Sequence, residues 1–109
     1  MGYTVNGVDL ETDEQGYLLE PDYGDDVVRV IAAAEHIELT EAHWKVIAYL
    51  RDEYREHGQT PNFRNLLKGL GETLPGCDSK ALYDLFPAGP AKQGAKLAGL
   101  PQPLGKGGY

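Results

Sequence analysis

The chain has almost no cysteine and no long apolar run. Cys77 is the one cysteine among 109 residues, so no internal disulfide can form and a cytoplasmic protein is expected. No apolar stretch approaches the roughly 20 residues that cross a bilayer, which argues against a membrane span. The N-terminal residues also lack the basic start and apolar stretch of a secretory signal. Residue six is Asn and not Ser or Thr, so Met1-Gly2 is a poor myristoylation site.

Acidic residues are missing from Leu85 onward. Residues 1–84 hold all 17 Asp and Glu and 7 of the 10 Lys and Arg, which gives −10, and the remainder holds three lysines, which gives +3. The acidic body argues against broad binding to nucleic-acid phosphates, which requires clustered Lys and Arg. The basic end could steer the encounter with a partner, although a plain solvated surface explains it about as well.

Length and composition predict one domain. A chain of 109 residues with 41% hydrophobic residues buries one modest core and not two independent ones. We assign residues 1–109 to a single domain with three parts: a β-hairpin region at 1–20, a helical core at 21–87 and a C-terminal arm at 88–109.

A β-hairpin is predicted at the N-terminus. Asn6 and Gly7 separate the runs 3–5 and 8–10, and both tolerate the positive φ values of a type I′ turn. A second turn at 13–16 leads to Tyr17-Leu18, which is considered as a third short strand. Such a small sheet must pack on helices to be stable.

Two helices are expected after the hairpin. The first spans about 25–35, and the second spans 41–57 with Thr40 as its N-terminal cap and Gly58 at its end. Periodicity predicts the buried faces of both. These faces are Val27, Val28, Ile31 and Ala34 in the first helix, and Trp44, Ile47, Ala48, Arg51 and Tyr54 in the second.

Three shorter helices are expected toward the C-terminus. Thr60 and Pro61 would begin one that runs to about Leu70, and Asp78 or Ser79 would cap another that Pro87 ends. The last would run from Pro90 to Gly99, after which Pro101 and Pro103 hold the exit extended. The predicted fold is mainly α: a small orthogonal helical bundle, helix-turn-helix-like, with an N-terminal β-hairpin and an extended C-terminal arm.

Few residues have the spacing of a catalytic or metal site. The histidines His36, His43 and His57 share no metal-ligand spacing with a carboxylate or cysteine, so no metal is predicted. The acids are scattered, without a paired-carboxylate pattern. The corner between the helices 41–57 and 61–70 has a helix-turn-helix outline. Its outward Arg64, Asn65 and Lys68 would read DNA, but a plain αα corner is commoner, and the acidic charge argues against DNA.

Four segments in the same order carry a resemblance to a known family. They are Asp13-Glu14-Gln15-Gly16-Tyr17-Leu18, Leu39-Thr40-Glu41-Ala42-His43-Trp44, Ser79 through Pro87, and the last stretch, LFPAGPAKQGAKLAGLPQP. Together they resemble the DsrC/TusE family of sulfur-relay proteins, also called the gamma-subunit family of dissimilatory sulfite reductase. The match runs nearly from end to end.

The resemblance implies a function that depends on thiols at the C-terminal arm. In this family a penultimate cysteine, and in many members a second one upstream, carries sulfur as a persulfide to a sulfite reductase or into tRNA thiolation. The corresponding positions here are Ala95 and Lys106, neither of which forms a persulfide. Cys77 is a surrogate thiol that precedes a capped helix, although an incidental cysteine is the simpler interpretation.

The functional hypothesis is therefore a non-catalytic regulatory or accessory protein of sulfur metabolism, with no cofactor. It would bind a sulfite-reductase-like or sulfur-transferase complex through its arm. The alternatives are a sulfur-relay protein (a sulfurtransferase) that acts through Cys77 and a helix-turn-helix DNA-binding regulator. The predicted partner-binding residues are Pro90, Lys92, Gln93, Lys96, Gly99, Leu100, Pro101, Pro103 and Lys106.

Overall fold

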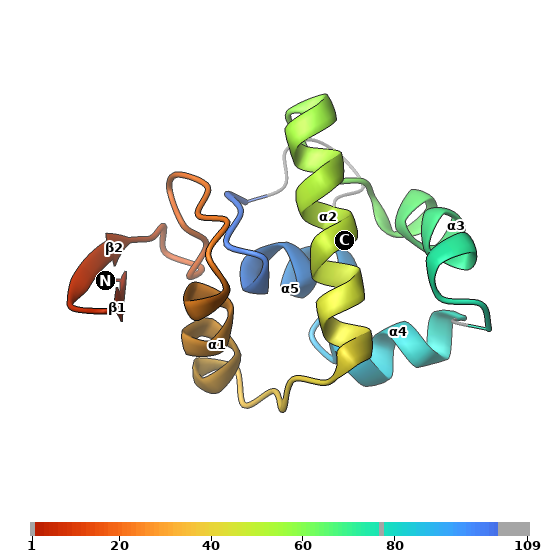
Figure 1. The fold of residues 1–109 in the computed structure, drawn as a ribbon, viewed down its shortest axis with the longest axis horizontal. Helices are drawn as coiled ribbons and strands as arrows, with labels where there is room; N and C mark the ends of the chain where they lie inside the picture. Colours follow the sequence, from red (N-terminus) through yellow and green to blue (C-terminus); the bar gives the residue numbers. More distant parts are fainter. Residues whose placement is uncertain (1, 77, 103–109) are drawn as a thin grey trace.

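The computed structural model describes residues 2–76 and 78–102 of the chain. Over these residues a hairpin precedes five helices, and the long helix α2 runs through the middle of the molecule (Figure 1). α1 and the hairpin lie on one side of α2, while α3 and α4 lie on the other. The elements are β1 (Gly2–Val5), β2 (Val8–Glu11), α1 (Asp25–Ala34), α2 (Glu41–His57), α3 (Phe63–Thr73), α4 (Ser79–Leu85) and α5 (Pro90–Leu97). The predicted mainly α class with a small N-terminal hairpin is confirmed.

The hairpin has the predicted turn. β1 and β2 pair antiparallel, with Val5 opposite Val8. Asn6 and Gly7 have φ values of 52° and 80°, as a type I′ turn requires. The third strand is reduced to a single bridge between Thr12 and Leu18.

The buried face of α1 differs in one position from the prediction. Ala32 is buried with the expected valines and isoleucine, whereas Ala34 is exposed. α1 lies between β1 and α5, so its buried face is wider on the Ala32 side. Ala34 is also the last residue of the helix, where the chain turns away through His36, whose φ is 60°.

α2 begins and ends as predicted, but its buried face is rotated. Thr40 accepts from the backbone N–H of His43, and Gly58 has a φ of 74° at the C-terminal end. Ala48, predicted to face inward, is exposed. α2 is contacted by both α3 and α5, which moves the buried face toward neighbouring positions. The buried residues of α2 are His43, Val46, Ile47, Leu50 and Arg51.

The cap of α3 was predicted wrongly. Asn62, not Thr60, is the N-terminal cap, and its side chain accepts from the N–H of Asn65. The sequence offers both residue types, and Pro61 suggested the earlier start. The helix also continues through Gly69 to Thr73, because Leu66 and Leu70 are buried against the rest of the core and outweigh the weak helix propensity of glycine.

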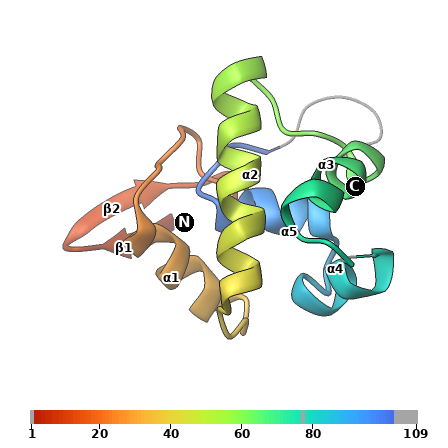
Figure 2. The same cartoon turned by 45° about the vertical axis from the view of Figure 1, so that its right-hand side comes forward.

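α5 lies at the centre of the fold. It contacts α1, α2, α3 and α4, and the view turned by 45° shows it directly behind α2 (Figure 2). Gly94 permits this approach, because a Cβ at that position would lie 2.9 Å from Cδ1 of Leu50. The first part of the predicted C-terminal arm is therefore a core helix. Among the described residues, no helix is long and apolar enough to cross a membrane.

Candidate functional site

The predicted partner-binding residues are mostly buried. α5 and the residues that follow it turn one face to the core. The accessible residues of this segment are Lys92, Lys96, Pro101 and Gln102. Because a partner cannot reach a buried side chain, the exposed members carry any recognition by this segment. Pro90, Gln93, Gly99 and Leu100 are buried, Lys96 and Pro101 are half-buried, Lys92 is exposed, and Pro103 and Lys106 lie outside the described residues.

Ala95 is part of the core. It has no exposed surface, and its carbonyl oxygen accepts from the N–H of Leu100 at 3.1 Å. The resemblance places the upstream cysteine of the family at this position. Here a methyl group fills the space, so the position contributes packing and no reactive group.

A polar cluster covers the outer face of α5. The Glu35 carboxylate, at the end of α1, accepts from Nε2 of Gln93 at 3.2 Å and from Nζ of Lys96 at 3.5 Å. Gln93 also accepts from the N–H of Ala88 through Oε1. The Lys96 ammonium lies 5.2 Å from the centre of the Tyr17 ring, within reach of a cation–π attraction. These side chains line a pocket of about 360 Å³, which also includes Lys92 and Gln102.

Tyr17 gives this cluster a neutral, protonated phenol. Burial, followed by the negative charges of Asp13 and Glu35, raises the pKa of Tyr17 to about 12. All three causes disfavour the phenolate. The ring therefore offers Lys96 an apolar face and no negative charge at neutral pH.

Arg51 joins three segments at the C-terminal end of α5. The side chain is buried, with Nε donating to the Ala98 carbonyl at 2.9 Å and Nη2 donating to the Gly24 carbonyl at 2.8 Å. A longer contact of 3.4 Å reaches the Asp25 carboxylate. Burial lowers the pKa of Arg51, and its bond to Asp25 opposes that shift. The sequence placed Arg51 on the inward face of its helix but gave no sign of these acceptors.

Cys77 lies outside the described residues. The next residue, Asp78, caps α4 by accepting from the N–H of Ala81 at 2.9 Å. This confirms Asp78 over Ser79 as the cap, and α4 starts at Ser79.

His43 connects two helices and has no free ring nitrogen. Its Nε2 lies 2.8 Å from the Leu85 carbonyl at the end of α4. Its Nδ1 accepts from the backbone N–H of Thr40 at 3.1 Å. The tautomer with the proton on Nε2 satisfies both contacts. His43 is therefore a structural residue in this chain.

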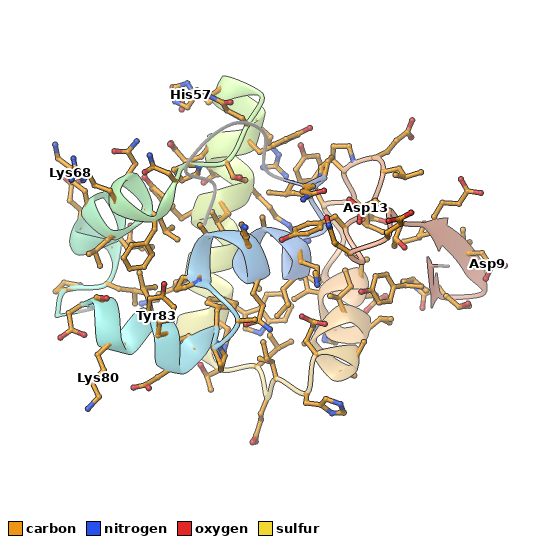
Figure 3. The ribbon with its side chains drawn as sticks, turned by 180° about the vertical axis from the view of Figure 1, so that it is seen from behind. Asp9, Asp13, His57, Lys68, Lys80 and Tyr83 are labelled. Carbon is orange, nitrogen blue, oxygen red and sulfur yellow. The ribbon has the colours of Figure 1, made fainter. Side chains whose placement is uncertain are left out.

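The structure brings together one group of possible metal ligands that the sequence did not predict. Glu53, Glu56 and His57 bring one ligand atom each within 4.8 Å of one another at the end of α2. The i, i+4 spacing of Glu53 and His57 was the available signal. Both Glu56 and His57 are exposed, and His57 extends from the tip of α2 (Figure 3). Exposed acidic groups of this kind are common without a metal.

The corner between α2 and α3 has the predicted outward side chains. Arg64, Asn65 and Lys68 are all exposed, and Lys68 projects away from the body of the molecule (Figure 3). With a charge of −10 over residues 1–84, these few groups exert little attraction on a phosphate backbone. DNA binding remains a prediction without further support.

The fold and the buried last helix define a class of small, mainly helical proteins with an N-terminal hairpin. The family model described as "DsrC like protein" matches residues 4–105. The chain belongs to this DsrC-like family. Among solved structures, the oxidized gamma-subunit of dissimilatory sulfite reductase (DsrC) from Archaeoglobus fulgidus has a TM-score of 0.86 at 38% identity, covering 96% of this chain and 98% of that one. The Allochromatium vinosum DsrC structure gives 0.84 at 44% identity, covering 93% of each chain.

Curated relatives are similar over nearly the whole chain. The "Sulfurtransferase TusE homolog" of Haemophilus influenzae is 50% identical over 103 residues, which covers 91% of this chain and 94% of the relative. "Sulfurtransferase TusE" of Escherichia coli is 42% identical over 101 residues, which covers 90% and 93%. The resemblance stated from the sequence motifs is thereby confirmed, together with its place in sulfur metabolism.

These relatives overturn the hypothesis of a non-catalytic regulatory or accessory protein. Proteins named as sulfurtransferases match this chain over about nine-tenths of its length, which supports a sulfur-relay role. The hypothesis was wrong because it gave two positions, Ala95 and Lys106, more weight than the similarity of the entire fold. The alternative of a sulfur-relay protein agrees better with the relatives.

Proposed function

We propose that this protein is a sulfur-relay protein that accepts sulfur from a donor persulfide and passes it to a partner protein in the cytoplasm. The observation that carries the proposal is the 50% identity over 103 residues to a protein named as a sulfurtransferase. The single cysteine in 109 residues is compatible with a reducing compartment.

Sulfur transfer requires a thiolate, and Cys77 is the one thiol in the sequence. The Cys77 thiolate attacks the outer sulfur of a donor persulfide, R–S–SH. A new S–S bond forms, the donor S–S bond breaks, and the donor thiolate R–S⁻ leaves with the electron pair. The product is Cys77–S–SH, and the transfer needs no external oxidant or reductant.

The partner would be a sulfur-transferase or sulfite-reductase-like protein. The relatives' names support a sulfur-transfer partner, and a structurally similar chain belongs to a structure named dissimilatory sulfite reductase I, with a TM-score of 0.79. On this chain, the accessible part of the predicted partner-binding segment is Lys92, Lys96 and the exit at Pro101. The positive charge of Lys92, which is exposed, favours an acidic surface on the partner.

The proposal is tested by persulfide loading. The full chain is incubated with glutathione persulfide, alkylated, and mapped by mass spectrometry, with Cys77→Ser as the control. We expect one added sulfur atom on the Cys77 peptide of the wild type and none on the variant.

A second variant, Lys106→Cys, separates this result from the family's arm chemistry. A wild type that stays unloaded while Lys106→Cys loads at residue 106 would overturn the assignment to Cys77. Equal loading of Cys77 in the wild type and in Lys106→Cys would support it.

A further inference from the structure

The N-terminal part of the chain carries the whole excess of negative charge. Residues 1–28 contain eight Asp and Glu and no Lys or Arg, which gives −8, whereas residues 29–109 contain nine acids and ten bases, which gives +1. The hairpin and the loop before α1 belong to this acidic part. They lie at the opposite end of the molecule from α3 and α4 (Figure 1).

Two hollows lie between the hairpin and this loop. The larger, of about 420 Å³, is lined by residues 9–11 and 18–22. The smaller, of about 350 Å³, lies between the turn of the hairpin and the first residues of α1. Both hollows include Leu10 and Asp22, so together they form one groove, which we call the hairpin groove.

Hydrogen bonds close the hairpin groove at both ends. At one end the N–H of Leu19 donates to the Glu11 carbonyl at 3.2 Å. At the other end Nδ2 of Asn6 donates to the Asp26 carboxylate at 2.8 Å. These two bonds fix the distance between the hairpin and the loop, so the groove exists without a bound partner.

The hairpin groove has apolar and acidic side chains next to one another. Val8 in the smaller hollow and Leu19 in the larger are 59% and 55% exposed, the highest values among the large hydrophobic side chains of the described residues. Such exposure often marks a binding surface. Glu11 and Glu20 also line the larger hollow and are exposed, and neither makes an ion pair within residues 2–76 and 78–102. Arginine and lysine fit such a surface, because their stems are apolar and their heads are charged.

The carboxylates of the groove are spread along it and do not meet at one point. Over the described residues, the one group of possible metal ligands within 4.8 Å of one another lies at the end of α2 and not here. A divalent cation binds several oxygen ligands at once, so the groove does not suit one. Nucleic acid is repelled by the same negative charge. Separate carboxylates with apolar neighbours suit basic side chains along a protein segment.

We propose that the hairpin groove binds a basic segment of a partner protein, which places arginine or lysine side chains in its hollows. In the larger hollow the stem packs on Leu19 and the charged head pairs with Glu11 or Glu20. The smaller hollow contributes less, because Asp25 and Asp26 already contact Arg51 and Arg29. This inference does not rest on the sulfur-relay function, since no residue of the groove takes part in the proposed transfer.

The test uses two peptides that carry the same charge. One is Ac-Gly-Arg-Gly-Arg-Gly-Arg-Gly-NH₂, the arginine peptide. The other, the short-stem peptide, carries each guanidinium on a single methylene. The full chain is titrated with each peptide and followed by amide NMR. We expect the short-stem peptide to bind about fivefold more weakly, because it buries fewer methylenes, and the arginine peptide to shift mainly the amides of residues 8–11 and 18–22.

A pair of double variants with equal charge locates the site. Glu11→Gln with Glu20→Gln removes two carboxylates from the groove and should weaken binding of the arginine peptide about fivefold. Glu72→Gln with Asp84→Asn removes two exposed acids of α3 and α4 and should weaken it by less than about twofold. An equal loss in both would mean attraction by net charge alone and would overturn the proposal.

Leu19→Ser tests the apolar part of the groove. In this variant the two peptides should bind with nearly equal affinity, because the stem has lost its apolar contact. Tyr83→Ser, at a side chain that is 45% exposed on α4, is the matched control and should keep the fivefold difference. Equal affinity of both peptides for the wild type would overturn the proposal. So would a dimer of the free chain that dissociates in the Glu11 and Glu20 double variant, since the occupant would then be a second copy.

Discussion

At the scale of single residues, buried polar groups in this protein hold separate segments together. His43 links α2 to the end of α4, Arg51 links α2 to the loop before α1 and to the end of α5, and Gln93 links α5 to Glu35. Each satisfies its hydrogen bonds with backbone or charged partners, as buried polar groups must. Their value lies in fixing one arrangement of helices.

The protonation of Tyr17 gives a prediction for alkaline pH. Its folded pKa of about 12 exceeds the ordinary value near 10, so the folded state holds the phenol proton more tightly than the unfolded state. The free energy of unfolding should fall as pH rises between these two values. In an absorbance titration of the phenolates, Tyr17→Phe should remove the step that occurs at the highest pH.

Urea unfolding at neutral pH and at pH about 11 tests the same linkage. Tyr17→Phe should show a smaller loss of stability over this interval than the wild type. An equal loss in both proteins would mean that the Tyr17 phenol does not resist ionisation.

At the scale of elements, side-chain caps determine where the helices begin. Thr40, Asn62 and Asp78 each accept a backbone N–H from the residue three positions later. α5 begins instead with Pro90 after Gly89, which suits a residue with a fixed φ and no N–H. The caps thus separate short helices that have little stability alone.

The corrected cap of α3 is tested by a pair of variants. Asn62→Ala should lower the free energy of unfolding by about 1 kcal/mol, because the N–H of Asn65 loses its acceptor. Thr60→Val should change it by less than about 0.5 kcal/mol or raise it. The Thr60 hydroxyl is buried, and it finds no hydrogen-bond partner in the described part of the chain.

Urea unfolding of both variants gives the comparison. A larger loss for Thr60→Val than for Asn62→Ala would restore the cap to Thr60, as the sequence had suggested.

At the scale of the whole molecule, the last helix organises the fold. α5 contacts every other helix, and Ala91, Leu97 and Leu100 in and after it have no exposed surface. Each fully buried leucine contributes about 1.5–3 kcal/mol, which is a large share of the 5–15 kcal/mol typical of a domain. The C-terminal region therefore consists of a core helix followed by residues that leave the core at Pro101 and Gln102.

Two truncations distinguish these parts. A chain that ends after Gly89 should lose its helical circular dichroism at room temperature, because the core is left without its central helix. A chain that ends after Gln102 should keep the wild-type melting temperature within a few degrees, because every contact described above is retained. A folded Gly89 truncation would contradict the central role of α5.

The sequence predicted elements well where the signal was local. The Asn6-Gly7 turn, the cap at Thr40 and the stop at Gly58 follow from short-range backbone chemistry. The inward positions Ala34 and Ala48 were wrong, because they depend on which helices pack on which side. The cap at Thr60 was wrong for a local reason, since Asn62 is also a capping residue and caps α3 instead. The Glu35–Gln93–Lys96 cluster and the acceptors of Arg51 join residues that are 26 to 61 positions apart, and no local pattern contains them.

By itself the sequence determined the hairpin, the mainly α class, the family and the absence of cysteine at the two arm positions. These depend on residue identity and on spacing within a few residues. Only the tertiary structure decided that residues 90–100 belong to the core and that Arg51 bonds the carbonyls of Ala98 and Gly24. Burial and hydrogen bonds across the fold depend on how helices close on one another, since the free energy of a buried group is set by its neighbours in space.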